Sequence, residues 1–168
     1  LDVNLKTSDI KKNDLKFHKK TVLCAIPTTA GSGAEVTPTA VIYINGLKYS
    51  IEHEKIKPDY FFLLPELIID SKKSLKAASG FDAISQGIES LISLKSNKES
   101  ILYSKKSLKY SFKSFQNFIK KPNLNNTFEM ALAANLSGKA IAISRTTAPH
   151  ALSYPFTSLF NVSHGHAV

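Results

Sequence analysis

The spacing of the apolar residues changes near residues 70–75, and this change constrains the fold more than any other feature of the chain. Before it, apolar residues come in short runs, "TVLCAI", "TAVIYI", "LKYSIE" and "YFFLL", divided by turn residues, which is typical of strands. After it, they recur every three or four residues over long segments, as on one face of a helix. The pattern predicts an α/β N-terminal portion, residues 1–71, followed by an all-helical portion, residues 72–168.

The strand-rich portion contains one clear hairpin signal. Asn45-Gly46 separates "TAVIYI" from "LKYSIE", and this dipeptide tolerates the positive φ angles of a tight turn. Cys24, the only cysteine, lies inside the first apolar run, where a buried strand thiol is expected. A single cysteine offers neither a disulfide framework nor a thiolate metal site.

The helical portion divides into several segments. Ser74 is expected to cap a short helix that ends at Ala78, Gly80 to interrupt it, and a longer helix to run from about Phe81 towards Ser96. An amphipathic helix with lysines on its polar side is predicted for Glu99 to Lys120. Its predicted packed positions are Ile101, Leu108, Phe112, Phe115 and Ile119.

Proline residues set further limits. Pro122 should end the amphipathic helix, and an alanine-rich, more buried helix should follow from Thr127 to Ser144. Pro149 and Pro155 should bracket a short helix, after which "NVSHGHAV" resembles a loop that enters the next helix.

The composition is that of a globular protein and narrows the expected partners. Of 168 residues, 43% are apolar and 21% charged, and no segment has the ~20 consecutive apolar residues that a membrane span requires. The first twenty residues carry six lysines, interleaved with acidic residues as on a solvated surface, in place of an apolar signal core. We therefore expect a cytoplasmic protein with no membrane partner.

The positive charge does not indicate nucleic-acid binding. The net charge of +9 comes almost entirely from lysine, and Arg145 is the only arginine. Nucleic-acid-binding proteins usually gather Arg and Lys with exposed aromatics or within a recognisable module, and neither pattern is present in the sequence. The charge favours small anionic substrates only weakly, by steering.

The two ends suggest an interior piece of a longer protein. Met130 is the only methionine, and the chain stops directly after "SHGHAV", where another apolar periodic segment begins. We therefore expect elements of the fold on both sides of this chain.

A glycine loop follows the first predicted strand. "PTTAGSGAEVT" offers small residues and hydroxyls that can approach a phosphate or a ring closely. It has neither the Lys-Ser/Thr ending of a P-loop nor the full spacing of a dinucleotide fingerprint, so a plain turn remains the alternative.

Oxygen and nitrogen ligands of metal-site type are spread over the helical portion. Asp82 and Gln86 are four residues apart and would share one helix face, while His150, His164 and His166 lie downstream. Such a set suits a divalent first-row cation. The alternatives stay open at this point: Asp82 as a helix cap, Gln86 as a surface amide and His150 as a core histidine.

Four segments together resemble the iron-containing (group III) alcohol dehydrogenase family. They are "PTTAGSGAEVT", "KPDYFFLLPELI", "KAASGFDAISQGIES" and "APHALSYPFTSLFNVSHGHAV", in family order from about Thr21 to Val168. The resemblance implies the dehydroquinate synthase-like fold, here truncated at both ends. It begins with the end of a Rossmann-like NAD(P)-binding domain and continues into a helical metal-binding domain, with the active site between them.

The resemblance also implies site residues. The family's metal ligands fall on Asp82, Gln86, His150 and His164, with Gln86 standing where the family has histidine. Tyr154 stands where many members have a further histidine, and its phenol would either contact substrate or pack. His166 is a candidate for proton relay. The implied cofactors are a divalent metal, Fe²⁺ or else Zn²⁺, and NAD(P)H, contacted by the loop residues Thr28, Thr29, Gly31, Ser32 and Gly33.

The departures at Gln86 and Tyr154 make the chain most similar to the phosphonoacetaldehyde reductase branch. That resemblance implies reduction of phosphonoacetaldehyde to 2-hydroxyethylphosphonate. Arg145, Thr146 and Thr147 would bind the phosphonate, because a guanidinium and two hydroxyls suit such a dianion. The alternatives are a simple alcohol or aldehyde as substrate, or an inactive fragment that at most binds metal. A homodimer is left open.

Overall fold

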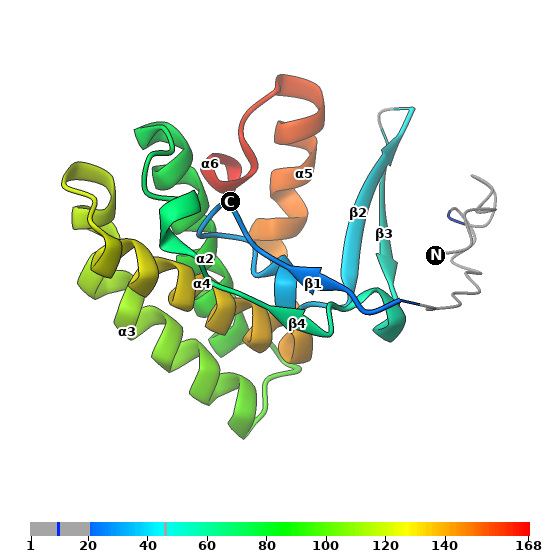
Figure 1. Cartoon of the computed structure of the whole chain (residues 1–168). Coiled ribbons are helices and arrows are strands. Elements are labelled where there is room, and N and C mark those ends of the chain that lie inside the picture. Colours follow the sequence, from blue (N-terminus) through cyan, green and yellow to red (C-terminus); the bar gives the residue numbers. More distant parts are fainter. Residues whose placement is uncertain (1–9, 11–20, 46) are drawn as a thin grey trace.

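The computed structural model describes residue 10, residues 21–45 and residues 47–168 (Figure 1). The predicted solvated surface of the lysine-rich first twenty residues lies outside the described residues. So does the first part of the predicted NAD(P)-binding portion. Within the described part of the chain, no helix combines the length and the apolar character that crossing a bilayer requires.

The described residues of the strand-rich portion form two small sheets. Strand β1 (Cys24–Ala25) pairs in parallel with β4 (Tyr60–Phe61), and β2 (Thr39–Ile44) pairs antiparallel with β3 (Leu47–Glu52). The predicted hairpin is therefore confirmed, and Asn45 at its turn has a φ of 52°, as such turns require. Three short 3₁₀ helices lie between or after the strands: Ala34–Val36, Glu54–Ile56 and Pro65–Leu67.

The prediction of a buried Cys24 thiol was wrong. Cys24 is exposed, and so are the neighbouring apolar side chains of Val22 and Leu23. The reason is that β1 has a single partner strand among the described residues, so little apolar surface is available to cover it.

Helix α2 (Lys73–Ile92) is continuous through Gly80, which corrects the predicted break. Glycine is required there by packing, because a Cβ at Gly80 would lie 2.8 Å from the ring of Phe115. The cap position is Lys72, so neither Ser74 nor Asp82 caps this helix. Asp82 and Gln86 consequently lie in the middle of a long helix and not in its first turns.

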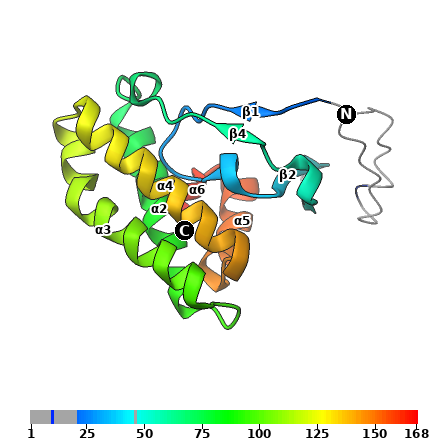
Figure 2. The same cartoon turned by 60° about the horizontal axis from the view of Figure 1, so that its bottom comes forward.

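Four further helices follow α2: α3 (Lys98–Lys120), α4 (Leu124–Ser144), α5 (Ala148–Phe160) and the single turn α6 (His164–Ala167). Asn97 and Asn123 begin α3 and α4 with reciprocal side-chain hydrogen bonds, which satisfy otherwise unpaired backbone groups. Helices α2, α3 and α4 pack against one another, and α5 and α6 return the chain towards α2 (Figures 1 and 2).

Pro155 does not end α5, contrary to the prediction. The helix continues to Phe160 with Pro155 inside it. Both Pro155 and Ala151, whose carbonyl would have accepted the missing N–H, are exposed, so water can bond that carbonyl.

The core lies where α3 and α4 meet the residues before α2. Ala30, Ile68, Phe118, Met130 and Ala131 are almost fully buried there. The face of α3 that contacts α4 is mostly serine, because Ser100, Ser104, Ser107, Ser111 and Ser114 are all buried. The predicted packed position Phe112 is instead 68% exposed, because the buried face of α3 is the neighbouring one that carries the serines.

Candidate metal centre

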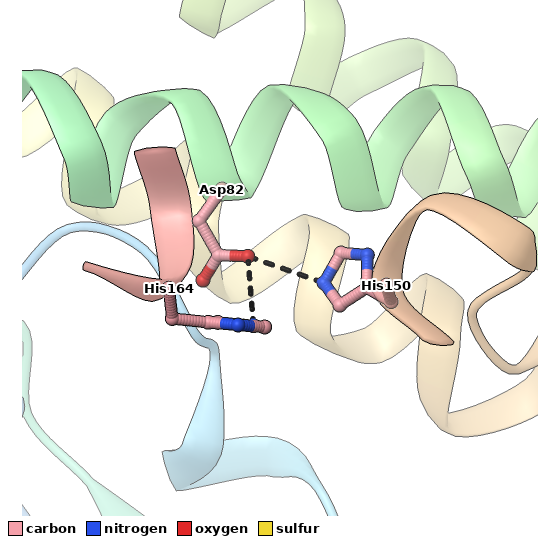
Figure 3. Close-up of side chains that lie close together, drawn as sticks. All are labelled: Asp82, His150 and His164. Carbon is pink, nitrogen blue, oxygen red and sulfur yellow. Dashed lines mark hydrogen bonds and ion pairs between the residues drawn. The ribbon is translucent and has the colours of Figure 1, made fainter. Parts of the chain in front are cut away.

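Three side chains from three helices converge at one place (Figure 3). Asp82 projects from α2, His150 from α5 and His164 from α6, and one ligand atom of each lies within 4.8 Å of the others. The Asp82 Oδ1 atom is 3.2 Å from Nε2 of His150 and 3.8 Å from Nε2 of His164. The two imidazoles therefore point the same ring nitrogen at the same carboxylate oxygen.

The position of His164 depends on the glycine that follows it. Gly165 is buried, and a Cβ there would lie 1.9 Å from the Ala78 carbonyl oxygen and 3.2 Å from the Asp82 Cβ. Only glycine allows α6 to lie this close to the backbone of α2. The sequence "SHGHAV" thus places an imidazole directly beside Asp82.

His150 is held on both sides of its ring. It is 4% exposed, its Nδ1 is bonded to Oε1 of Glu89, and its Nε2 faces Asp82. Burial alone would lower the pKa of His150, but the hydrogen bonds to Asp82 and Glu89 and their charges outweigh burial and raise it from 6.5 to about 9. Without a metal, His150 is therefore an imidazolium at neutral pH, shared between two carboxylates.

Glu89 is itself anchored at the start of α5. Its Oε2 accepts hydrogen bonds from the Thr147 backbone N–H at 2.5 Å and from the Thr147 hydroxyl at 2.9 Å. Burial raises the pKa of Glu89, but the bonds from His150 and Thr147 lower it by more. Glu89 is thus an ionised carboxylate even though it is 2% exposed.

His164 is less enclosed than His150. Its side chain is 39% exposed, its Nδ1 lies 3.3 Å from the Ser153 hydroxyl, and its ring stacks on Tyr154 with centroids 5.9 Å apart. Ser153 also donates to the backbone carbonyl of His150 at 2.8 Å. One serine therefore contacts both histidine-bearing segments.

The donor set fits a divalent first-row cation. One carboxylate and two imidazoles with their Nε2 atoms directed inward are ligands that Fe²⁺ and Zn²⁺ accept. Gln86 lies one helical turn after Asp82 and is 3% exposed. Its Oε1 accepts from the Ser137 hydroxyl at 2.9 Å and its Nε2 lies 3.4 Å from the Ser32 carbonyl. Its role as a fourth ligand stays a prediction.

A cavity of about 760 Å³ opens onto these side chains. Besides Asp82, His150 and His164, its walls include Ser32, Glu52, Gln86, Arg145, Thr146 and Tyr154. The guanidinium of Arg145 forms an ion pair with Glu52 of β3. Arg145 itself follows α4 with a φ of 65°, a conformation that turns the chain sharply towards α5.

Several predicted site residues lie apart from this cavity. Thr147 faces Glu89, and His166 is exposed on α6, so neither lines the walls. Of the five predicted cofactor contacts in the glycine loop, Ser32 lines this cavity, as do Ala34 and Thr37 later in the loop, whereas Thr28, Thr29, Gly31 and Gly33 do not. The roles predicted for these residues remain predictions.

The loop glycines make close contacts with the helices. A Cβ at Gly31 would lie 2.7 Å from the Ser79 carbonyl oxygen of α2. A Cβ at Gly33, whose φ is 59°, would lie 2.5 Å from the Gly138 Cα of α4. The glycines thus let the loop dock on the helical portion, whatever further role they have.

Sequence reasoning missed Glu89 and Ser153. Glu89 follows Asp82 and Gln86 in the spacing of one helix face, and this spacing could have indicated that all three side chains share a site. Ser153 carries no comparable signal, because its importance depends on the path of the chain between His150 and His164.

Sequence comparisons match the chain in two segments. Residues 3–65 match the profile of iron-containing alcohol dehydrogenase, and residues 76–168 match the C-terminal profile of the Fe-containing alcohol dehydrogenase family. A phosphonoacetaldehyde reductase from Streptomyces viridochromogenes is 34% identical over 146 residues, which cover 85% of this chain and 37% of that protein. A bifunctional aldehyde-alcohol dehydrogenase from Escherichia coli is 31% identical over 173 residues, covering 98% and 19% respectively.

The comparison with solved structures agrees with the sequence matches. An iron-containing alcohol dehydrogenase from Thermotoga maritima superposes with a TM-score of 0.88 at 31% identity, covering 98% of this chain and 45% of that one. A sulfoacetaldehyde reductase from Bifidobacterium kashiwanohense, in complex with NAD⁺, superposes with a TM-score of 0.84 at 30% identity, covering 87% and 40%. The chain spans less than half the length of each of these relatives.

Proposed function

Because the chain belongs to the iron-containing alcohol dehydrogenase family, we propose that the protein is a metal-dependent oxidoreductase that uses NAD(P)H to reduce an aldehyde to a primary alcohol. Membership of the family confirms the resemblance inferred from the four motifs. It also confirms the predicted fold class, a small strand-containing portion followed by a helical domain.

The observation that carries the proposal is the convergence of Asp82, His150 and His164 on one cavity. These residues would hold the metal, with Gln86 as a predicted fourth ligand. A bound Fe²⁺ or Zn²⁺ supplies Lewis-acid polarisation of the aldehyde oxygen, which favours hydride transfer to the carbonyl carbon. We propose Fe²⁺ as the natural metal, as the family description indicates.

The surrounding residues bind and orient the reactants. Tyr154 is among the residues that line the cavity, and its phenol is the proposed hydrogen-bond donor to the substrate. Ser32 brings the glycine loop into the cavity wall beside Gln86 of α2, and this loop is the proposed contact for the nicotinamide cofactor. The NAD⁺ complex of the sulfoacetaldehyde reductase supports NAD(P)H as that cofactor.

We propose phosphonoacetaldehyde as the substrate. Arg145 and Thr146 line the cavity that the metal ligands share, so a phosphonate could bind them while its aldehyde faces Asp82. Two relatives, a phosphonoacetaldehyde reductase and a sulfoacetaldehyde reductase, carry names that denote two-carbon aldehydes with an anionic group. These names support the proposal that Arg145 is the cation that binds an anionic substrate.

A second candidate is a simple uncharged aldehyde. Arg145 already has a carboxylate partner in Glu52, and a phosphonate would have to displace or share that partner. The aldehyde-alcohol dehydrogenase of E. coli is almost as similar in identity as the phosphonoacetaldehyde reductase. Only the charge carried by the substrate separates the two candidates.

Steady-state kinetics on the complete natural protein, loaded with Fe²⁺ or Zn²⁺, tests both candidates. Phosphonoacetaldehyde and acetaldehyde are compared with NADH and NADPH, for the wild type and for Arg145→Ala. Loss of a charge-assisted hydrogen bond worth ~1.5–3 kcal/mol should raise the KM for phosphonoacetaldehyde ~10- to 100-fold and leave that for acetaldehyde unchanged. Lys113→Ala, which removes an exposed cation paired with Glu129, is the matched control.

Each outcome decides between the candidates. An unchanged KM for phosphonoacetaldehyde in Arg145→Ala contradicts the phosphonate assignment, and equal use of acetaldehyde by the wild type favours the simple aldehyde. A protein that binds metal and both cofactors but reduces neither aldehyde would overturn the proposed activity in favour of a non-catalytic metal-binding protein.

A further inference from the structure

We propose that Glu89 is a positioning residue that fixes which nitrogen of His150 is offered to the metal, and that Thr147 holds Glu89 in place for this task. The inference rests on the proposed metal site, but it concerns residues that do not themselves reach the metal. Neither the four motifs nor the ligand set predicted from them assigns this role.

The contacts around Glu89 leave its carboxylate no freedom. The Oε1 atom is bonded to Nδ1 of His150, and Oε2 accepts two hydrogen bonds from Thr147. The side chain of Glu89 is 3% exposed and that of His150 5%, so water cannot replace these partners. A buried carboxylate with both oxygens engaged holds a single orientation.

This orientation selects one form of the imidazole. An ionised carboxylate can only accept hydrogen bonds, so the His150 nitrogen that faces Glu89 must carry a proton. In a neutral ring the other nitrogen, Nε2, then has the free lone pair. That nitrogen is the one directed at Asp82, at 3.2 Å, where the metal would bind.

Without Glu89, the opposite tautomer becomes favourable. Nε2 could then keep the proton and donate it to the Asp82 carboxylate, leaving the lone pair on Nδ1, away from the site. A ring in that form cannot bind a metal beside Asp82. Outer partners of metal-binding histidines typically contribute 10- to 100-fold in metal affinity, and Glu89 stands in that position here.

Thr147 links this role to the fold. It is the cap residue directly before α5, three residues before His150, and its N–H and hydroxyl both point at Glu89 of α2. The same carboxylate therefore orients the ring and ties the start of α5 to α2. A test has to separate these two effects.

The test compares Glu89→Met with Glu89→Gln in the complete natural protein. Methionine keeps the approximate volume but offers Nδ1–H no strong acceptor, whereas glutamine retains a carbonyl oxygen. We expect zinc affinity, measured by titration against a competing chelator, to fall 10- to 100-fold in Glu89→Met and by less in Glu89→Gln. Glu129→Met, which removes a carboxylate of α4 that contacts Lys113 and Ser114, should leave zinc affinity unchanged.

Nitrogen NMR of the His150 ring distinguishes two roles of Glu89: orienting the imidazole and stabilising the fold. In the zinc-bound wild type, the proton should reside on Nδ1 with the slow exchange of a buried hydrogen bond. In metal-free protein at pH 10, the Nδ1–H tautomer should dominate in the wild type and lose its dominance in Glu89→Met. Thr147→Val, which removes one of the three bonds to Glu89, gives a milder change if Glu89→Met does not fold, and should lower zinc affinity several-fold.

The outcomes keep the two proposals apart. Unchanged zinc affinity and an unchanged His150 tautomer in Glu89→Met would overturn the role of Glu89. If Thr147→Val is the variant that can be studied, unchanged zinc affinity there would likewise overturn it. A wild type that binds no zinc, cobalt or iron would overturn the proposed metal site, while the metal-free tautomer would still report on Glu89.

Discussion

Replacing Gly165 by alanine should weaken metal binding while the protein stays folded. A Cβ at this position would lie 1.9 Å from the Ala78 carbonyl oxygen, whereas real Cβ atoms essentially never come closer than 3.0 Å. The obstacle is the backbone of α2, which cannot rotate away as a side chain can. We therefore expect α6 to retreat from α2 by about 1 Å.

This retreat moves His164 away from Asp82. The two side chains are separated by 3.8 Å between Nε2 and Oδ1, a spacing that one bound ion can bridge. A misplacement of about 1 Å is large relative to the tolerance of a metal–ligand bond, which is roughly 0.2 Å. We expect zinc affinity to fall ~10- to 100-fold, and the free energy of unfolding to fall by only ~1–3 kcal/mol, as is usual for overpacking.

Zinc titration against a competing chelator and thermal unfolding measure the two quantities. Gly87→Ala is the matched control, because Gly87 lies on α2, the helix that α6 contacts, and its Cβ would meet side-chain atoms of Leu108 at 3.0 Å and Ser107 at 3.7 Å instead of backbone. Its zinc affinity should match that of the wild type. Wild-type zinc affinity in Gly165→Ala would refute the inference that the close contact of α6 with α2 places His164.

Four further predictions address the site and the core. Because the pKa of His150 is raised from 6.5 to about 9, its contribution to the stability of the metal-free protein should be complete below pH 6.5 and be lost as the pH rises through about 9, which unfolding at a series of pH values measures. Zinc must displace a proton from His150, so apparent zinc affinity should rise with pH up to about 9 and level off above it. Gln86→Ala should lower the bound iron or zinc found by elemental analysis if Gln86 is the fourth ligand, and unchanged metal content would assign Gln86 to the Ser137 and Ser32 contacts alone. Phe118→Ala, at a core position that is 0% exposed, should cost ~3–5 kcal/mol in chemical unfolding, and a loss below ~1 kcal/mol would contradict the assignment of the core.

The order and type of the main elements could be predicted because they depend on local signals. The Asn45-Gly46 turn and the helical spacing after residue 98 led to elements close to the observed ones. The predicted break at Gly80 failed because the reason for that glycine is Phe115 on another helix. Local rules treat glycine as a helix breaker and contain no information on what packs against it.

The sequence could predict only those site residues that ligand chemistry or the family resemblance identifies. Asp82, His150 and His164 are residue types that bind metals, and the structure brings them together. Glu89 and Ser153 contact the ring nitrogens that face away from Asp82, and such contacts depend on how α2, α5 and α6 meet. From the sequence alone, a packing role for Gly31 and Gly33 could not be distinguished from a cofactor-binding role. The helix residues that they contact lie far along the chain.

The serine face between α3 and α4 restricts side-chain size far more than polarity. The hydroxyls of Ser104 and Ser111 have no hydrogen-bond partner among the residues that the structure describes, so alanine should be accepted at both positions at little cost. A leucine at either position would instead force the two helices apart. Serine and alanine should therefore be interchangeable at these two positions. A prediction from hydrophobicity alone assigns the wrong face of α3 to the protein interior. Phe112, predicted to pack but exposed, is an example.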